Sequence, residues 1–281
     1  MEGYRLSKNI NIKSDTVVRN DFELNTVNGL KILQAKSLLK YQDFFTHAFS
    51  TRIGANTPKP YDAFNIGRHV NDERLLNDAS DNRRKLCQAL NLNYNNLTIP
   101  WQKHTDNIAI IDKKVDLEGC DAVATRTKDL PILLTFADCV PIIAFDPDLK
   151  LICGIHAGWA GTAQNILSKA LAKMVNIGSK RESIIVAIGP AIGKCCYEVG
   201  QDTLTKLKNS CSDSFDFSLV LNTGLKENYV DLKALNLYQA IFFNVGVVSV
   251  TDYCTACNSD LFYSHRRSFG LTGRHGLIIS L

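Results

Sequence analysis

Three residues of this 281-residue chain, His104, Cys139 and His156, combine side chains that suit a zinc ion. Imidazole nitrogen and thiolate sulfur are typical zinc ligands, and three protein ligands leave a fourth position for water or substrate. Such a metal lowers the pKa of bound water to about 7, which makes hydroxide available at neutral pH. The three residues are 35 and 17 positions apart. They differ in this from the closely paired ligands of zinc fingers, so each is expected at a different strand end.

The residue types alone also fit a buried cysteine and two unrelated histidines, because cysteine is often buried for packing. Asp138 precedes Cys139 and is a candidate for orienting a ligand or transferring a proton. Neighbouring side chains of a strand point to opposite faces, so Asp138 and Cys139 need a bend to share one pocket. Arg52 and Arg83 are candidates for binding phosphate or a carboxylate, and ordinary salt bridges are the alternative for both.

The nine cysteines argue against a disulfide scaffold, because such scaffolds are shorter, denser in cysteine and usually even-numbered. Cys195-Cys196 and Cys254-x-x-Cys257 are candidates for a second metal site. Adjacent cysteines are poor chelates, however, and the single CxxC has no partner CxxC, so a second zinc site is disfavoured. The first residues contain no apolar run typical of a signal peptide. Reduced thiols and a cytoplasmic location are expected.

The net charge of +4 comes from scattered Lys and Arg residues. Nucleic-acid binders more often carry a basic stripe with interleaved aromatics, so no nucleic-acid partner is expected. No apolar stretch approaches the roughly 20 residues of a membrane span, so no membrane association is expected either. Local clusters of basic residues are better suited to binding small anionic molecules than to binding nucleic acid.

The hydrophobic pattern predicts strands interspersed with helices in a mixed α/β or α+β arrangement. Residues 1–45 are predicted to form a peripheral segment with a strand or two, and 46–281 a single catalytic domain. Strands are expected at 101–111, 121–125, 130–136, 140–145, 151–156, 183–189, 246–250 and 277–281. Helices are expected at 75–90, 163–175, 203–208 and 232–243.

Nine short motifs follow one another along the chain after residue 45. They are Phe49-Ser-Thr-Arg52, Asn82-Arg83, Gln102-Lys-His104, Ala137-Asp-Cys139-Val-Pro-Ile, His156-Ala-Gly-Trp-Ala-Gly161, Ile188-Gly-Pro-Ala-Ile-Gly193, Cys196-Tyr-Glu-Val199, Ser264-His-Arg-Arg267 and Thr272-Gly-Arg274. In these motifs the chain resembles the multicopper polyphenol oxidase, or laccase-domain, family. Members of that family have been reassigned as purine nucleoside phosphorylases with adenosine deaminase activity.

The resemblance implies an α-β-β-α sandwich, with mixed β-sheets flanked by helices, and a zinc centre at His104, Cys139 and His156. It implies phosphorolysis of adenosine-, inosine- and guanosine-type nucleosides to base and ribose 1-phosphate, and deamination of adenosine to inosine. Purine nucleosides and phosphate are then the partners, and the protein is a monomer or small homo-oligomer. The catalytic residues would be Asp138, Arg52 and Cys139, and the substrate or phosphate contacts Arg52, Arg83 and Asn82.

The chain departs from the family pattern after Arg52, where Gly54-Ala55 replaces the usual Gly-Gly pair and 56–60 looks like an insertion. Alanine at a position that requires positive φ would cost stability or shift the loop.

Three other functions stay open. Cys139 is a candidate nucleophile activated by His156, in a hydrolase that edits peptidoglycan precursors. Copper-dependent phenol oxidation is a further alternative, but a multicopper centre needs about ten histidine ligands and the chain has six histidines. A binding or assembly protein with a structural zinc would lose its fold on chelation and turn over no nucleoside.

Overall fold

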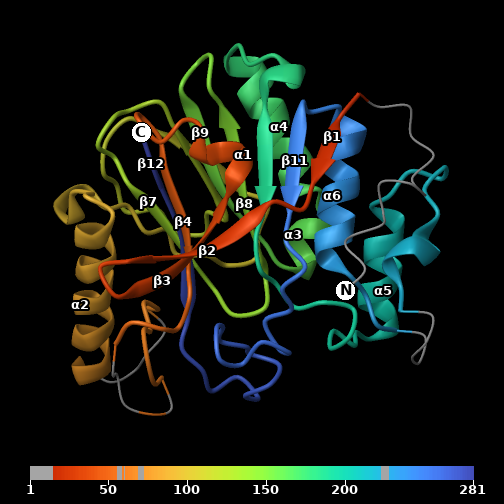
Figure 1. Ribbon diagram of the computed structural model, residues 1–281. Helices are drawn as coiled ribbons and strands as arrows, with labels where there is room; N and C mark the ends of the chain where they lie inside the picture. The colour runs from red at the N-terminus through yellow and green to blue at the C-terminus, as the bar shows by residue number, and fades with distance from the viewer. Residues whose placement is uncertain (1–14, 56–58, 60, 69–72, 223–227) are drawn as a thin grey trace.

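Two β-sheets lie face to face in the computed structural model, which describes residues 15–55, 59, 61–68, 73–222 and 228–281 (Figure 1). The seven-stranded sheet has the order β1 (Val17–Arg19), β11 (Val247–Val250), β10 (Ile185–Ile188), β8 (Val140–Asp146), β9 (Leu151–Ala157), β6 (Ala122–Thr125) and β5 (Ile108–Ile111). The five-stranded sheet has the order β2 (Phe22–Val27), β3 (Leu30–Ala35), β4 (Thr46–Ser50), β12 (His275–Ser280) and β7 (Ile132–Phe136).

Helices cover the outer faces of both sheets, with α2 beside the five-stranded sheet and α4 and α6 beside the seven-stranded one (Figure 1). The helices are α1 (Lys36–Leu39), α2 (Glu73–Ala89), α3 (Trp159–Ala163), α4 (Ile166–Ile177), α5 (Gln201–Asn209) and α6 (Leu232–Phe243). Short 3₁₀ helices lie at Tyr94–Asn96, Arg181–Ser183 and Phe217–Val220. This is the α-β-β-α sandwich that the motifs imply, and the prediction is confirmed.

The strand sequences explain the layers, because alternate side chains of a strand point to opposite faces. In β7, Leu134 packs between the two sheets while Leu133 packs in the layer under α2. In β8, Ile143 packs between the sheets and Ile142 packs under α4 and α6. Gly154 of β9 lets the sheets approach closely, since a Cβ there would lie 3.0 Å from Leu134 Cδ1. Strands buried on both faces therefore form the centre of the molecule.

The N-terminal segment supplies strands to both sheets. The edge strand β1 pairs in parallel with β11, and β2 forms the other sheet's edge next to β3. Ile32 and Leu33 of β3 are buried, so from residue 17 this segment is part of the sandwich as well as of its edges. Residues 1–14 of the predicted peripheral segment lie outside the described residues.

Two predicted elements are shorter or divided. The expected strand 101–111 is a strand only at Ile108–Ile111, because the backbone around His104 turns away from the sheet with φ at 58°. The expected helix 163–175 is divided into α3 and α4 at Asn165, whose φ of 58° is a left-handed conformation that asparagine tolerates.

The loop after β4 places the left-handed conformation on a glycine. Gly54 has φ of 135°, and Ala55 is not among the residues with positive φ. Alanine in place of the family's second glycine therefore causes no backbone strain at that position. Residues 56–58 and 60 of the insertion-like stretch lie outside the described residues.

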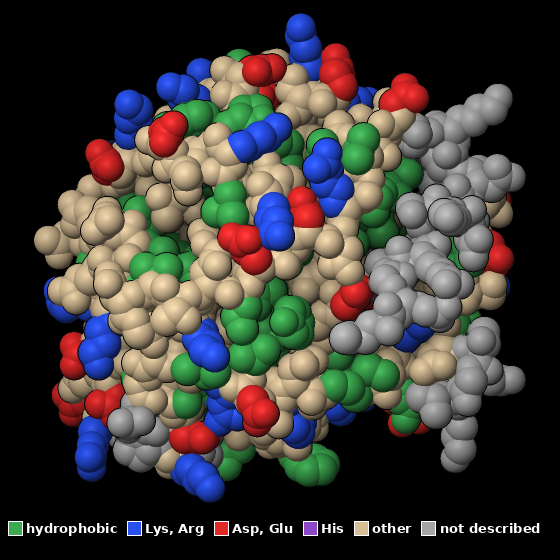
Figure 2. Space-filling view, in the orientation of Figure 1, with side chains coloured by type: hydrophobic (Ala, Val, Ile, Leu, Met, Phe, Trp, Pro, Cys, Tyr) green, Lys and Arg blue, Asp and Glu red, His purple; other side chains and the backbone are tan. Residues whose placement is uncertain are grey.

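The face of the molecule in Figure 2 mixes the two signs of charge, with Lys and Arg interspersed among Asp and Glu. Within the described ranges, each helix is too short or too polar to span a lipid bilayer.

Two buried histidines make stability depend on pH. Burial lowers the pKa of both His47 and His275 to about 3. His47 Nε2 accepts a hydrogen bond from the Ala35 N–H at 3.0 Å, which requires the neutral ring. Both folded-state pKa values lie below the unfolded value near 6.5, so the unfolded state takes up protons first as pH falls. Each neutral histidine thus contributes stability that is present at neutral pH and lost on acidification.

We expect His275→Phe to flatten this dependence. Between about pH 7 and about pH 5 the free energy of unfolding of the wild type should fall by about 2 kcal/mol for each buried histidine. The variant should lose about 2 kcal/mol less than the wild type over that range, because phenylalanine does not titrate. Urea denaturation at both pH values measures the difference. Equal losses in the two proteins would contradict this account.

Candidate active site

The antiparallel β8–β9 pair brings the first two candidate ligands together. Val140 lies opposite Ala157 and Pro141 opposite His156 in the register of this pair. Cys139, which immediately precedes β8, therefore lies next to the end of β9, where His156 is buried with 4% exposure. Neighbouring strand ends thus place a thiol and an imidazole at one edge of the seven-stranded sheet, although 17 residues separate them in the sequence.

A buried carboxylate holds the third ligand in place. Asp121, directly before β6, is fully buried and its Oδ2 accepts hydrogen bonds from the N–H groups of Lys103 and Thr105 and from the Thr105 hydroxyl. Its Oδ1 accepts from the His104 N–H at 3.1 Å and meets His156 Nδ1 at 2.7 Å. The loop that carries His104 is therefore fixed to the same group that orients His156.

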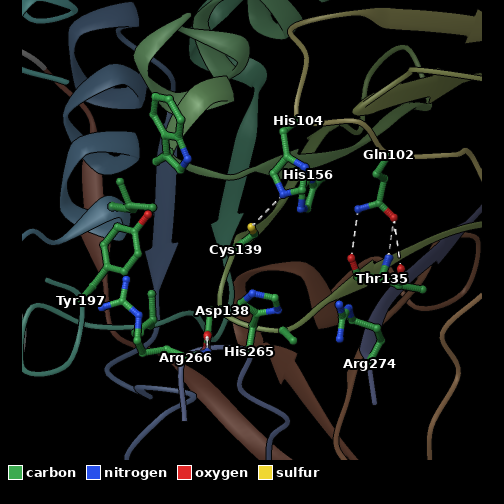
Figure 3. Close-up of a pocket in the computed structure, with 14 residues that line it drawn as sticks. Gln102, His104, Thr135, Asp138, Cys139, His156, Tyr197, His265, Arg266 and Arg274 are labelled. Carbon is green, nitrogen blue, oxygen red and sulfur yellow. Dashed lines mark hydrogen bonds between the residues drawn. The ribbon is translucent and has the colours of Figure 1, made fainter. Parts of the chain in front are cut away.

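The three ligand atoms fit a zinc ion. Nitrogen and sulfur atoms of His104, Cys139 and His156 all lie within 4.8 Å of one another, and Cys139 Sγ is 3.7 Å from His104 Nε2 (Figure 3). A tetrahedral ion with Zn–S near 2.3 Å and Zn–N near 2.0–2.1 Å separates S and N by about 3.6 Å. Because Asp121 holds His156 Nδ1, the other ring nitrogen remains for the metal, an arrangement common around zinc.

Gly158 makes room for this cluster. Its backbone is extended, with φ −72° and ψ −178°, so any residue could adopt it. A Cβ at this position, however, would lie 2.8 Å from His104 Cδ2 and 3.1 Å from Cys139 Sγ. The position therefore requires glycine, because any larger residue would crowd His104 and Cys139.

The same contacts shift the pKa values of the cluster. Burial disfavours the Cys139 thiolate, but the positive charge of His156 and hydrogen bonds from both histidines outweigh it and lower the pKa to about 6. Burial likewise disfavours protonated His156, yet Cys139 and Asp121 raise its pKa to about 9. Burial also opposes ionisation of Asp121, and its hydrogen bond to His156 dominates and lowers the pKa to about 2. The lowered pKa of Cys139 favours its thiolate, the form that binds metals and acts as a nucleophile.

The cluster faces a cavity of about 450 Å³, a size within the usual range for small-molecule sites. In the view of Figure 3, His104 lies above Cys139, while Asp138, His265, Arg266 and Arg274 lie below it. The lining residues are Gln102, His104, Thr135, Ala137, Asp138, Cys139, His156, Trp159, Ile192, Tyr197, Leu232, His265, Arg266 and Arg274.

Asp138 lies beside Cys139 at the bend that the sequence requires, with φ of 90°. Its carboxylate accepts hydrogen bonds from the Thr255 hydroxyl at 2.6 Å, the Ser264 hydroxyl at 3.0 Å and the Arg266 N–H at 2.7 Å. Three donors occupy its oxygens, so its geometry suits holding the cavity wall better than transferring protons.

Arg52, Asn82 and Arg83 are not among the described residues that line this cavity. Arg52 pairs with Asp62 at 2.8 Å and lines a separate surface hollow. Arg83 Nη1 donates to the carbonyls of Ile66 and Gly67, and Asn82 donates to the carbonyl of Asn65. The structure thus does not bring these three residues together with His104, Cys139 and His156.

Sequence reasoning gave no role to Asp121, His265, Arg266 or Arg274. The two arginines stand within the motifs Ser264–Arg267 and Thr272–Arg274, and the concentration of basic residues there is a sequence feature that indicates an anion site. Asp121 has no such signal, because only the β6–β9 pairing places it behind His156.

Residues 46–281 match the family model described as multi-copper polyphenol oxidoreductase laccase. The chain belongs to this family. The resemblance seen in the motifs is confirmed, and the match spans the cluster, the cavity and every strand from β4 onward.

Relatives and solved structures agree with this placement. Purine nucleoside phosphorylase YlmD of Bacillus subtilis is 31% identical over 269 residues, covering 90% of this chain and 94% of the relative. A protein named adenosine deaminase, from an unknown prokaryotic organism, is 30% identical over 233 residues, covering 78% and 88%. The crystal structure of YlmD from Geobacillus stearothermophilus superposes with a TM-score of 0.84 at 28% identity, covering 93% of this chain and 99% of that one.

We expect Asp121→Asn to weaken zinc binding about 10- to 100-fold, the usual cost of losing a carboxylate behind a histidine ligand. The amide keeps the shape, but its NH₂ group would face donors that now meet carboxylate oxygen. Chelator competition measures the affinity. Asp106→Asn is the control, because Asp106 lies on the same loop and pairs with Lys169 instead. Equal zinc affinity in the two variants would count against the role of Asp121.

Gly158→Ala should weaken zinc binding on the order of tenfold, because the new methyl group would push His104 and Cys139 apart. Gly200→Ala is a matched control. Gly200 also precedes a helix with an extended backbone, at φ −72° and ψ 161°, and a Cβ there would meet nothing within 4 Å. Zinc titration of both variants tests the prediction, and undiminished binding by Gly158→Ala would refute it.

Proposed function

We propose that this protein is a zinc-dependent enzyme of purine nucleosides, which catalyses phosphorolysis to base and ribose 1-phosphate and deamination of adenosine to inosine. The observation that carries the proposal is the convergence of His104, Cys139 and His156 on one cavity that also contains free volume for a nucleoside and two arginines. The names of relatives, purine nucleoside phosphorylase and adenosine deaminase, support the substrate class.

The cavity offers surfaces for a flat base. Trp159 and Tyr197 contribute aromatic rings to its lining. The Arg266 guanidinium lies over the Tyr197 ring, 5.1 Å from its centroid, and holds that ring in place. Aromatic faces favour stacked rings, so we assign the purine to this side of the cavity.

We assign phosphate to Arg274 in place of Arg52 and Arg83, because Arg274 lies on the cavity with the metal ligands. Its Nη1 donates to the carbonyls of Thr272 and Gly273, which fixes the direction of the guanidinium. A planar guanidinium held in this way suits bidentate binding of a phosphate. Arg266 adds a second positive charge to the same wall.

The reactions differ in the attacking group. In deamination the oxygen of water adds at C6 of adenosine and ammonia leaves; in phosphorolysis a phosphate oxygen bonds to C1′ while the C1′–N9 bond breaks and the base takes up a proton. A bound zinc would supply Lewis-acid charge stabilisation. The protein's own residues position the groups: Asp121 orients His156, Arg274 binds the anion, and Asp138 fixes the backbone that carries Arg266.

A metal-independent cysteine hydrolase is the second candidate, and one observation favours it. Cys139, His156 and Asp121 form a thiol–imidazole–carboxylate series, with the Asp121–His156 contact at 2.7 Å and the Cys139 pKa lowered to about 6. Such a series can activate a nucleophile for cleavage of a peptide-like bond.

The decisive experiment incubates zinc-loaded protein with adenosine or inosine, with and without phosphate, and separates the products. Phosphate-dependent hypoxanthine or adenine is expected from phosphorolysis, and inosine from deamination. Cys139→Ser should abolish both activities together with zinc binding at the cavity. Arg274→Met should reduce phosphorolysis at least tenfold while deamination persists, because only phosphorolysis needs the anion site.

No product from either nucleoside with wild-type protein would defeat the proposal. Turnover of a peptide-like substrate by zinc-free protein, lost in Cys139→Ser, would establish the hydrolase instead. Arg52→Met serves as the control for Arg274→Met, since Arg52 lies in a different hollow.

A further inference from the structure

Four cysteines gather at a second place in the fold, away from the three ligands described above. Cys195 and Cys196 lie in the loop after β10, and Cys254 and Cys257 in the loop after β11. Their four sulfur atoms all lie within 4.8 Å of one another. Each is a free thiol, so no disulfide joins them. The adjacent pair and the lone CxxC each lack a partner in the sequence, and the fold makes them partners of each other.

The spacing of the sulfur atoms matches that of a tetrahedral metal site. Cys257 Sγ lies 3.4 Å from both Cys195 Sγ and Cys196 Sγ. Four thiolates at about 2.3 Å from one zinc ion would lie about 3.8 Å apart. The observed separations, from 3.4 Å to at most 4.8 Å, bracket that value. Small side-chain adjustments would therefore complete the geometry.

We propose that Cys195, Cys196, Cys254 and Cys257 form a second metal site, a closed tetrathiolate that holds a soft divalent ion of the zinc class. It differs in kind from the first cluster. Four protein sulfurs leave no open position, as in structural zinc sites, whereas three mixed ligands on a cavity leave one.

The surroundings support a thiolate cluster. The Gly193 N–H donates to Cys254 Sγ at 3.2 Å, a bond of the kind that stabilises sulfur ligands. Backbone pairing fixes the two loops in register, since the Thr255 N–H donates to the Ala191 carbonyl at 3.1 Å. Four thiolates and one divalent ion leave net negative charge. The buried Lys233 side chain lies next to one of the two loops, because its Nζ donates to the carbonyls of Thr251 and Tyr253, just before Cys254.

The cluster joins the two loops that form one wall of the cavity. From the second loop, the hydroxyl of Thr255, next to Cys254, donates to Asp138. From the first loop, the carbonyls of Cys196 and Glu198 accept hydrogen bonds from the Arg266 side chain. A metal at the cysteines would thus hold Arg266 and its stacked Tyr197 in place without touching a substrate. Its role is structural.

The test measures zinc per chain in purified protein by elemental analysis. A His104→Ala/His156→Ala variant, with the first site removed, should keep one zinc. Adding Cys195→Ser/Cys257→Ser should remove it; both residues are exposed, so these changes are compatible with folding. Cys211→Ser is the control, because this cysteine belongs to neither cluster, and it should leave the zinc content unchanged.

X-ray absorption of the His104→Ala/His156→Ala variant should show four sulfur neighbours at about 2.3 Å from zinc. Hydrogen exchange in the loops at 189–200 and 251–267 should be faster in Cys195→Ser/Cys257→Ser than in the control, as loss of the metal releases them. This readout is independent of any activity and of the first site.

The proposal would be overturned by the absence of zinc in the His104→Ala/His156→Ala protein, by zinc retained after Cys195→Ser/Cys257→Ser is added, or by nitrogen and oxygen neighbours of zinc in the absorption spectrum of the His104→Ala/His156→Ala protein. A disulfide between these cysteines, seen as two thiols missing on titration of the same variant, would also overturn it. Failure of nucleoside turnover bears on the first cluster alone, so the two proposals stand or fall separately.

Discussion

The buried carboxylate of Asp121 is the group on which the candidate site depends. A carboxylate removed from water is costly unless donors satisfy it, and here backbone N–H groups of a loop and one histidine ring do so. Because the buried carboxylate is stable only with these donors, the 103–105 loop is held against the end of β9. Two residues that are distant in sequence, His104 and His156, become neighbours as a result.

A second buried carboxylate, Asp138, fixes another part of the cavity lining in the same way. Its carboxylate accepts hydrogen bonds from Thr255, Ser264 and Arg266, which all lie on the segment after β11. One acid thus fixes the candidate metal ligands and the other fixes the part of the cavity lining that carries the positive charges. Both are buried, and their hydrogen bonds are stronger than in water because the surroundings have a low dielectric constant. The cavity is therefore preorganised before a substrate arrives.

The sequence predicts those features that depend on local hydrophobic patterns and on short motifs. Alternating and continuous apolar runs located β7, β8 and β9, and the motifs located His104, Cys139, His156 and the sandwich. Features that depend on contacts between segments distant in sequence cannot be predicted from it. They are the role of Asp121, the burial of Arg83 against backbone carbonyls, and the proximity of the two cysteine pairs. An arginine looks alike in sequence whether it binds a phosphate or a carbonyl group.

The place of β12 has a consequence for how the chain matures. This strand lies between β4 and β7 in the five-stranded sheet, yet it leaves the ribosome long after both. Until it arrives, β4 and β7 present unpaired backbone groups, which are templates for association with other chains. Such late, long-range closure slows folding and lengthens the period of exposure. Chaperone demand during synthesis should thus concentrate on this sheet, even though Cys139 and His156 lie at strand ends of the other one.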